Sequence, residues 1–70
     1  MKTHEGQEAK GWDLEIYQPR GYWSPCATRR KITSHADGVA YALEIGLAER
    51  EHYDGRSAPR TGMWRIREST

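Results

Sequence analysis

Histidine and cysteine are the residues of this sequence best suited to metal binding or catalysis. The chain holds three histidines, His4, His35 and His52, and one cysteine, Cys26. Imidazole and thiolate groups bind transition metals and, beside an oriented base, serve as nucleophiles. No two histidines stand four residues apart, and Cys26 has no second ligand at metal-binding spacing. The sequence therefore predicts no metal site, no cofactor and no catalytic residue, and we expect that the protein is not an enzyme.

Basic side chains offer a second kind of chemistry, the binding of nucleic acid. The stretch 28–31 contains three cations, and Tyr22 and Trp23 precede it closely. Cations and aromatic rings on a sheet can contact phosphates and stack on bases. However, eleven Lys and Arg face ten Asp and Glu, and the formal net charge of +1 is small for a protein that depends on phosphate contacts. Nucleic-acid binding on the open sheet face stays the alternative function, with candidate residues Arg29, Arg30, Lys31, Arg65 and Arg67.

Three short stretches predict the strands that would position these groups. Residues 11–18 alternate apolar and polar, and residues 26–33 and 63–69 do so less regularly. Pro19, Gly21 and Pro25 predict a turn between the first two strands. A helix that links the second strand to the third makes those two strands parallel in a right-handed crossover. The first strand then lies in the middle, and the spatial order is 2-1-3.

The most apolar stretch, residues 39–49, belongs to a predicted helix that begins after Ser34 and ends near Glu51. Ser34 is the expected N-cap, and Asp37 suits the positive helix end. At about 100° per residue the helix has two apolar sides. We expect Val39, Ala40, Leu43 and Leu47 to face the sheet, and Tyr41, Ile45 and Ala48 to face away from it.

The predicted fold is an α+β domain of the ββαβ type, with a three-stranded sheet and one helix packed on one face. The helix side of the sheet should hold Trp12, Leu14, Ile16, Ile32, Trp64 and Ile66. On the open side, Asp13 and Glu15 of the central strand should lie between cations of both neighbours, because opposite charges on adjacent strands attract. Those cations are Arg65 and Arg67 on one side and Arg29 and Lys31 on the other.

The chain divides into a polar N-terminal part and one domain. We expect residues 1–10 to form a flexible tail and residues 11–70 to form a single small domain. No apolar run reaches the roughly 18 residues that span a bilayer, and the N-terminus lacks the apolar core of a signal peptide. A single cysteine cannot form an internal disulfide. These features predict a cytoplasmic protein that does not contact a membrane.

The outward side of the helix is the best functional lead in the sequence. Two interpretations stay open: residues 53–62 fold back and cover it, or it is a surface for a protein partner or a second copy of the chain. In size and predicted element order the chain is similar to small phage- or mobile-element-encoded inhibitors, which implies a regulatory, inhibitor-type function but carries no residue across. We expect a small non-enzymatic binding protein that docks on a protein partner. The predicted contacts are Tyr41, Ile45, Ala48, His52, Arg56 and Arg60.

Overall fold

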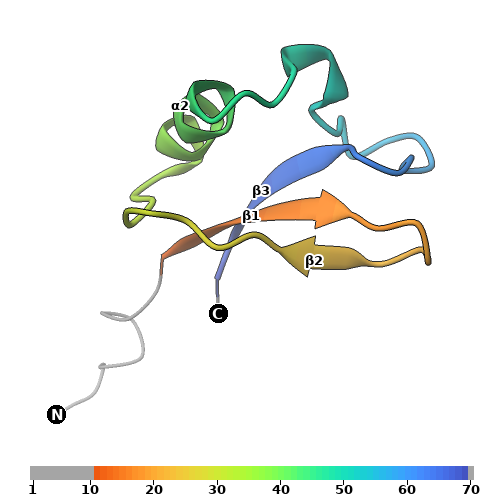
Figure 1. The fold of residues 1–70 in the computed structure, drawn as a ribbon, viewed down its shortest axis with the longest axis horizontal. Coiled ribbons are helices and arrows are strands. Elements are labelled where there is room, and N and C mark those ends of the chain that lie inside the picture. Colours follow the sequence, from red (N-terminus) through yellow and green to blue (C-terminus); the bar gives the residue numbers. More distant parts are fainter. Residues whose placement is uncertain (1–10, 70) are drawn as a thin grey trace, which may run out of the picture.

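The computed structural model describes residues 11–69 as a three-stranded antiparallel sheet with one helix on one face (Figure 1). The strand order is β2-β1-β3, which confirms the predicted α+β class, the ββαβ order and the central first strand. The predicted flexible tail, residues 1–10, lies outside the described residues. In chain order the elements are β1 (Trp12–Tyr17), β2 (Trp23–Pro25), α2 (His35–Glu44), the 3-10 helix η1 (Glu49–Glu51) and β3 (Trp64–Glu68).

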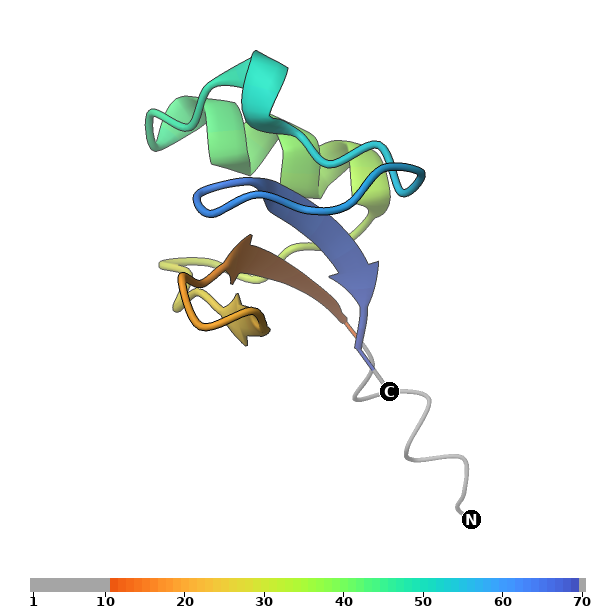
Figure 2. The ribbon, with the colours of Figure 1, turned by 90° about the vertical axis from the view of Figure 1, so that its right-hand side faces the viewer.

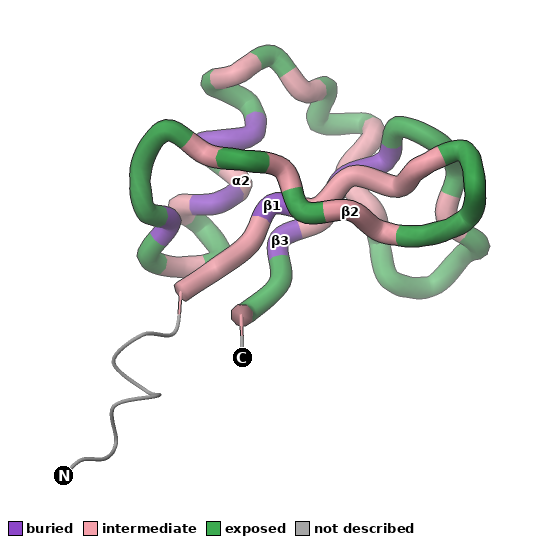
Figure 3. The backbone as a smooth tube through the Cα atoms, turned by 60° about the horizontal axis from the view of Figure 1, so that its bottom comes forward, coloured by how far each residue is buried: buried purple, intermediate pink, exposed green. Residues whose placement is uncertain are grey.

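The core lies between the helix and the pair β1–β3. Leu14 stands opposite Ile66 and Ile16 opposite Trp64 in this antiparallel pair, so alternate residues of both strands reach the helix side. The buried stretches of the two strands and of α2 face one another in Figure 3. The predicted sheet side of the core is confirmed, with Trp12 and Ile16 packed at its margin. The core cluster contains Leu14, Ile32, Tyr41, Ala42, Trp64 and Ile66.

The second strand is shorter and earlier than predicted. Residues 26–33 form no strand, and β2 is Trp23–Pro25 instead. The Gln18 N–H donates to the Tyr22 carbonyl at 2.8 Å and Gly21 adopts φ +94°, so the turn closes tightly and pairing starts sooner. In this register the Pro25 nitrogen faces away from β1, so proline is tolerated there, and the Cys26 N–H still donates to the Leu14 carbonyl at 2.8 Å. The chain then leaves the sheet, although Ile32 still reaches the core with 1% of its surface exposed.

The helix begins as predicted but ends earlier. The Ser34 Oγ accepts a hydrogen bond from the Asp37 N–H at 3.0 Å, which confirms the N-cap. The predicted end near Glu51 is wrong, since α2 stops at Glu44. Gly46 follows with φ +101°, and its N–H donates to the Leu43 carbonyl while the Leu47 N–H donates to the Ala42 carbonyl. This is a Schellman C-cap, for which glycine is the favoured residue.

The rotation of α2 about its axis is the opposite of the prediction. Gly38, Tyr41 and Ala42 are its buried residues, whereas Ala40 and Leu43, expected in the core, are exposed. A β-carbon at Gly38 would lie 2.6 Å from Ile66 Cγ2. Glycine therefore lets the helix backbone approach β3 closely, and the face that carries it must face the sheet.

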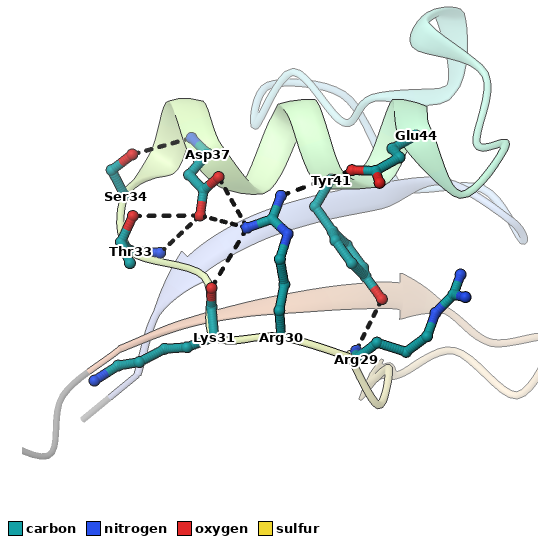
Figure 4. A network of polar contacts seen from close by, with 8 residues as sticks. All are labelled: Arg29, Arg30, Lys31, Thr33, Ser34, Asp37, Tyr41 and Glu44. Atoms are coloured by element: carbon teal, nitrogen blue, oxygen red, sulfur yellow. Dashed lines mark hydrogen bonds and ion pairs between the residues drawn. The ribbon is translucent and has the colours of Figure 1, made fainter.

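The open face of the sheet carries the predicted opposite charges on β1 and β3, but not the predicted cations on β2. Glu15 stands opposite Arg65 and Asp13 opposite Arg67 in the β1–β3 register. The Arg65 Nε lies 2.7 Å from Glu15 Oε1. The expected flanking by cations of the second strand is wrong, because Pro25 occupies the position opposite Glu15. Arg29 and Lys31 belong to the irregular segment that leads to α2 (Figure 4).

The segment 53–62 packs beside the sheet and not on the outer side of α2. The Tyr53 N–H donates to the Trp64 carbonyl at 2.8 Å, and the Tyr53 ring lies 5.2 Å from that of Trp23. The first residues of the segment lie near the start of α2, where Tyr53 and Asp54 line a groove with His35, while Ala40 and Leu43 stay exposed. Met63 is buried where the segment returns to β3. None of the helices in residues 11–69 is long and apolar enough to cross a membrane.

Candidate functional site

The outward side of α2 is an exposed apolar surface. Ala36, Ala40 and Leu43 are exposed, and their spacing places them within one narrow sector of the helix. We call these three residues the outer face of α2. Leu43 has 41% of its surface exposed, and among residues 11–69 it shares the class of exposed large hydrophobic residues only with Tyr22, at 53%. Val39 and Leu47 border the outer face and pack partly against the core.

Tyr41 fixes the rotation of α2 that leaves this surface outside. Its hydroxyl oxygen accepts a hydrogen bond from the Arg29 N–H at 3.0 Å, and only 4% of the residue is exposed. The Arg30 guanidinium lies over the Tyr41 ring at 5.1 Å from the ring centroid. Figure 4 shows the Tyr41 side chain extending from α2 toward the backbone of residues 29–31, the segment that leads into the helix. The segment therefore covers one flank of the helix and leaves the outer face open.

A charged rim runs along that flank. The Arg30 Nη1 donates to both carboxylate oxygens of Asp37 at 3.0 Å, and its Nη2 lies 3.8 Å from Glu44 Oε1 (Figure 4). The hydrogen bond from Arg30, followed by that from the Thr33 N–H, holds the pKa of the Asp37 carboxyl below its usual value. An apolar centre beside a polar rim is the usual anatomy of a protein interface.

The six predicted partner contacts do not form one surface. Tyr41 lies in the core, and Ile45 is the half-buried C-cap of α2 that packs against it. Both were expected to face outward, and the position of Gly38 on their side of the helix explains the reversal. Ala48 is exposed, but its carbonyl accepts a hydrogen bond from Trp64 Nε1 at 2.9 Å. The remaining three, His52, Arg56 and Arg60, belong to the end of the 3-10 helix and to the loop.

The five basic candidates for nucleic-acid binding are divided between two places. Arg29, Arg30 and Lys31 lie beside α2, where Arg30 is held by the two acidic residues of that helix. Arg65 lies on the open sheet face, paired with Glu15 and 4.1 Å above the Trp23 ring centroid. Arg67 is exposed on the same face, opposite Asp13. The expected single basic face is therefore not formed, because residues 26–33 are not a strand.

A groove of about 610 Å³ opens at the side of β3. Two histidines line it: the His52 ring stacks on Trp64 with 4.4 Å between ring centroids, and His35 lies 6.0 Å from His52. Burial, and secondly the nearby His35, lower the pKa of His52. Glu49 and Asp54 also line the groove, yet within residues 11–69 no three potential ligands gather as a metal site.

The fold and these surfaces define a small α+β domain with an exposed apolar helix face. Comparison of the chain with protein-family models, with curated proteins and with solved structures gives no match. The functional interpretation therefore depends on the geometry of the chain itself. The structure adds Leu43 to the candidate site, whereas the sequence pattern assigned this residue to the core.

Proposed function

We propose that this protein is a small non-enzymatic binding protein that docks on a protein partner through the outer face of α2. The observation that carries the proposal is the exposure of Leu43, the large apolar residue of the outer face, in a chain with a mean hydropathy of -0.99. Fully burying a leucine side chain gains roughly 1.5–3 kcal/mol, of which the exposed part of Leu43 would supply about 1 kcal/mol. Association would recover this free energy.

Two further features support docking at this surface. Ala36 and Ala40 are small, so a partner can approach the helix backbone closely around Leu43. The rim formed by Arg30, Asp37 and Glu44 is already held in place by ion pairs, which lowers the entropy cost of ordering it on binding. We expect a regulatory role of the inhibitor type, in the cytoplasm, in which the protein occupies a surface of its partner.

Site-specific photocrosslinking in the producing cells tests the proposal. A photoreactive amino acid at position 43 should give a covalent adduct with a partner protein. The same group at position 22 is the matched control, because Tyr22 is at least as exposed and lies in the β1–β2 turn. The absence of any adduct at position 43, or equal adducts at both positions, would contradict the proposal.

Sedimentation of the purified protein distinguishes the two kinds of protein partner. A second copy of the chain should appear as a dimer that Leu43→Glu dissociates, because an ionised carboxylate cannot be buried in an apolar contact without a large desolvation cost. A different partner leaves the purified protein monomeric while the adduct in cells persists.

A further inference from the structure

The outer edge of β3 has backbone groups that face away from the sheet. The Met63 carbonyl accepts from the Tyr17 N–H, and the Ser69 N–H donates to the Gly11 carbonyl, each at 2.8 Å. Because an antiparallel ladder alternates, the odd-numbered residues of β3 bond to β1. The backbone N–H and C=O groups of the even-numbered residues point to the outer edge, and these residues are Trp64, Ile66 and Glu68.

Only the first of these three residues is paired at that edge. His52 forms an isolated parallel bridge with Trp64, and the Tyr53 N–H donates to the Trp64 carbonyl. The chain then turns away, as Asp54 accepts hydrogen bonds from the N–H groups of the two residues after Gly55. No hydrogen bond within residues 11–69 uses the outward groups of Ile66 and Glu68. An edge of this kind can pair with another strand.

The groove lies where the paired segment leaves β3. Arg65 and Ile66 form its β3 side, and His35 and His52 stand on the helix side. Figure 2 shows the C-terminal half of β3 running on below the helix, past the point where the 53–62 segment leaves it. An added strand would continue the line of residues 52–53, with one side chain toward the two imidazole rings and its neighbours toward the open sheet face.

The charges on the open face indicate what such a strand should carry. The β1 column contains Asp13 and Glu15, and the β3 column contains Arg65 and Arg67. Side chains interact mainly with those of the adjacent strand. Arg65 is held by Glu15 and the Trp23 ring, and Tyr53 already lies beside it on the outer edge. A strand beside the rest of β3 therefore meets Arg67 directly and Asp13 only across it. An acidic side chain beside Arg67 in the next column therefore extends the alternation of charge.

A second copy of β3 fits this edge poorly. Antiparallel pairing about Ile66 would set Arg65 against Arg67, and pairing about Arg67 would set that residue against its own copy. Like charges directly opposite each other on neighbouring strands are destabilising. Glu49 and Asp54 line the groove on its far side, so they disfavour a carboxylate there and leave that position to an apolar side chain.

We propose that the outer edge of β3 at Ile66–Glu68 binds an extended acidic peptide by strand addition. One acidic side chain of the peptide lies opposite Arg67. The residue beside Ile66 is apolar and enters the groove beside His35 and His52. Backbone hydrogen bonds to Ile66 and Glu68 hold the peptide, as in other complexes that extend a sheet by one strand. This inference is independent of the docking surface on α2.

Titration with a short capped peptide in which glutamate alternates with valine tests the proposal by NMR. The amide signals of Ile66 and Glu68 should shift most, and a matched peptide with lysine in place of glutamate should bind more weakly by roughly tenfold or more. Equal binding of the two peptides, or shifts centred elsewhere, would overturn the proposal.

Glu68→Pro separates strand addition from general attraction between charges. Proline removes the outward N–H of residue 68 without removing a bond to β1, and edge positions tolerate it. Strand addition predicts roughly tenfold weaker binding of the acidic peptide, since a backbone hydrogen bond is lost and the ring obstructs the edge. General attraction predicts tighter binding, because a negative charge is removed. Unchanged or tighter binding by this variant would overturn the proposal.

Arg67→Glu provides the charge test, and Leu43→Glu provides the control. Arg67→Glu should weaken binding of the glutamate peptide and strengthen binding of the lysine peptide. Leu43→Glu should bind the glutamate peptide as the unaltered protein does, because the outer face of α2 and the edge of β3 are different surfaces. If the peptide does not bind but the photoreactive group at position 43 still gives its adduct, strand addition is overturned and the proposed docking through α2 is not.

Discussion

Helix α2 has two apolar faces, and they differ in shape more than in hydrophobicity. The face toward the sheet holds Gly38, Tyr41 and Ala42, whereas the outer face holds two alanines and Leu43. By hydrophobicity alone the leucine side should be buried. The inner face packs against the sheet because Gly38 allows close contact with Ile66 and because Tyr41 finds a hydrogen-bond partner there. Close approach of the backbone and a satisfied polar group therefore decide the rotation of this helix.

Enlarging one side chain on each face should give the largest difference in the free energy of unfolding. Gly38→Val would force atoms into Ile66, where even a single β-carbon lies 2.6 Å from Cγ2. We expect the free energy of unfolding to fall by about 3 kcal/mol, measured by urea denaturation, because overpacking a buried site strains the core. Ala40→Val, on the outer face, should lower it by only about 0.5 kcal/mol, in line with helix propensity. Equal losses in the two variants would contradict the assigned rotation.

Removing one hydroxyl group tests the polar part of the same contrast. Tyr41→Phe leaves the ring in place but removes the acceptor of the Arg29 N–H. The free energy of unfolding should fall by about 1 kcal/mol, the usual value for one hydrogen bond in a folded protein. Tyr22→Phe is the matched control on an exposed tyrosine and should leave thermal unfolding unchanged. A Tyr41→Phe variant as stable as the unaltered protein would show that this hydrogen bond does not hold the helix.

Asp37 in the charged rim of α2 should give the smallest effect, which appears as a pH dependence of stability. The pKa of Asp37 is lowered by its hydrogen bonds with Arg30 and Thr33, so folding favours the ionised carboxylate. Its contribution to stability is present above the pKa of the unfolded chain and is lost as the pH falls through the lower pKa of the folded protein. Asp37→Asn should therefore be less stable at neutral pH, and the difference should disappear in acid. A difference that persists through the acid range would refute this origin.

The order of strands and most of the core could be predicted from the sequence. Alternation in β1 and β3 fixed which residues face the helix, and the right-handed crossover rule placed β1 in the middle. The N-cap at Ser34 was equally local, since a side chain three residues before the donating N–H determines it. These features depend on neighbours in the chain or on a general rule of topology.

The rotation of α2 and the position of β2 could not be predicted in the same way. Apolar periodicity gave two faces of similar hydrophobicity, and the deciding contacts of Gly38 and Tyr41 involve residues far apart in sequence. Glycine inside a helix was nevertheless a usable signal, because it often marks a close approach. Gly46 likewise marked the end of the helix. The early start of β2 followed from a tight turn, which short-range alternation does not reveal.

The most direct test of the central claim is the capture of the partner by the Leu43→Glu variant at matched stability. If the outer face of α2 binds the partner and contributes little to the fold, capture should fall by roughly tenfold or more. The free energy of unfolding should stay within about 0.5 kcal/mol of its original value, as for other exposed positions. Undiminished capture by a stably folded Leu43→Glu protein would contradict the account.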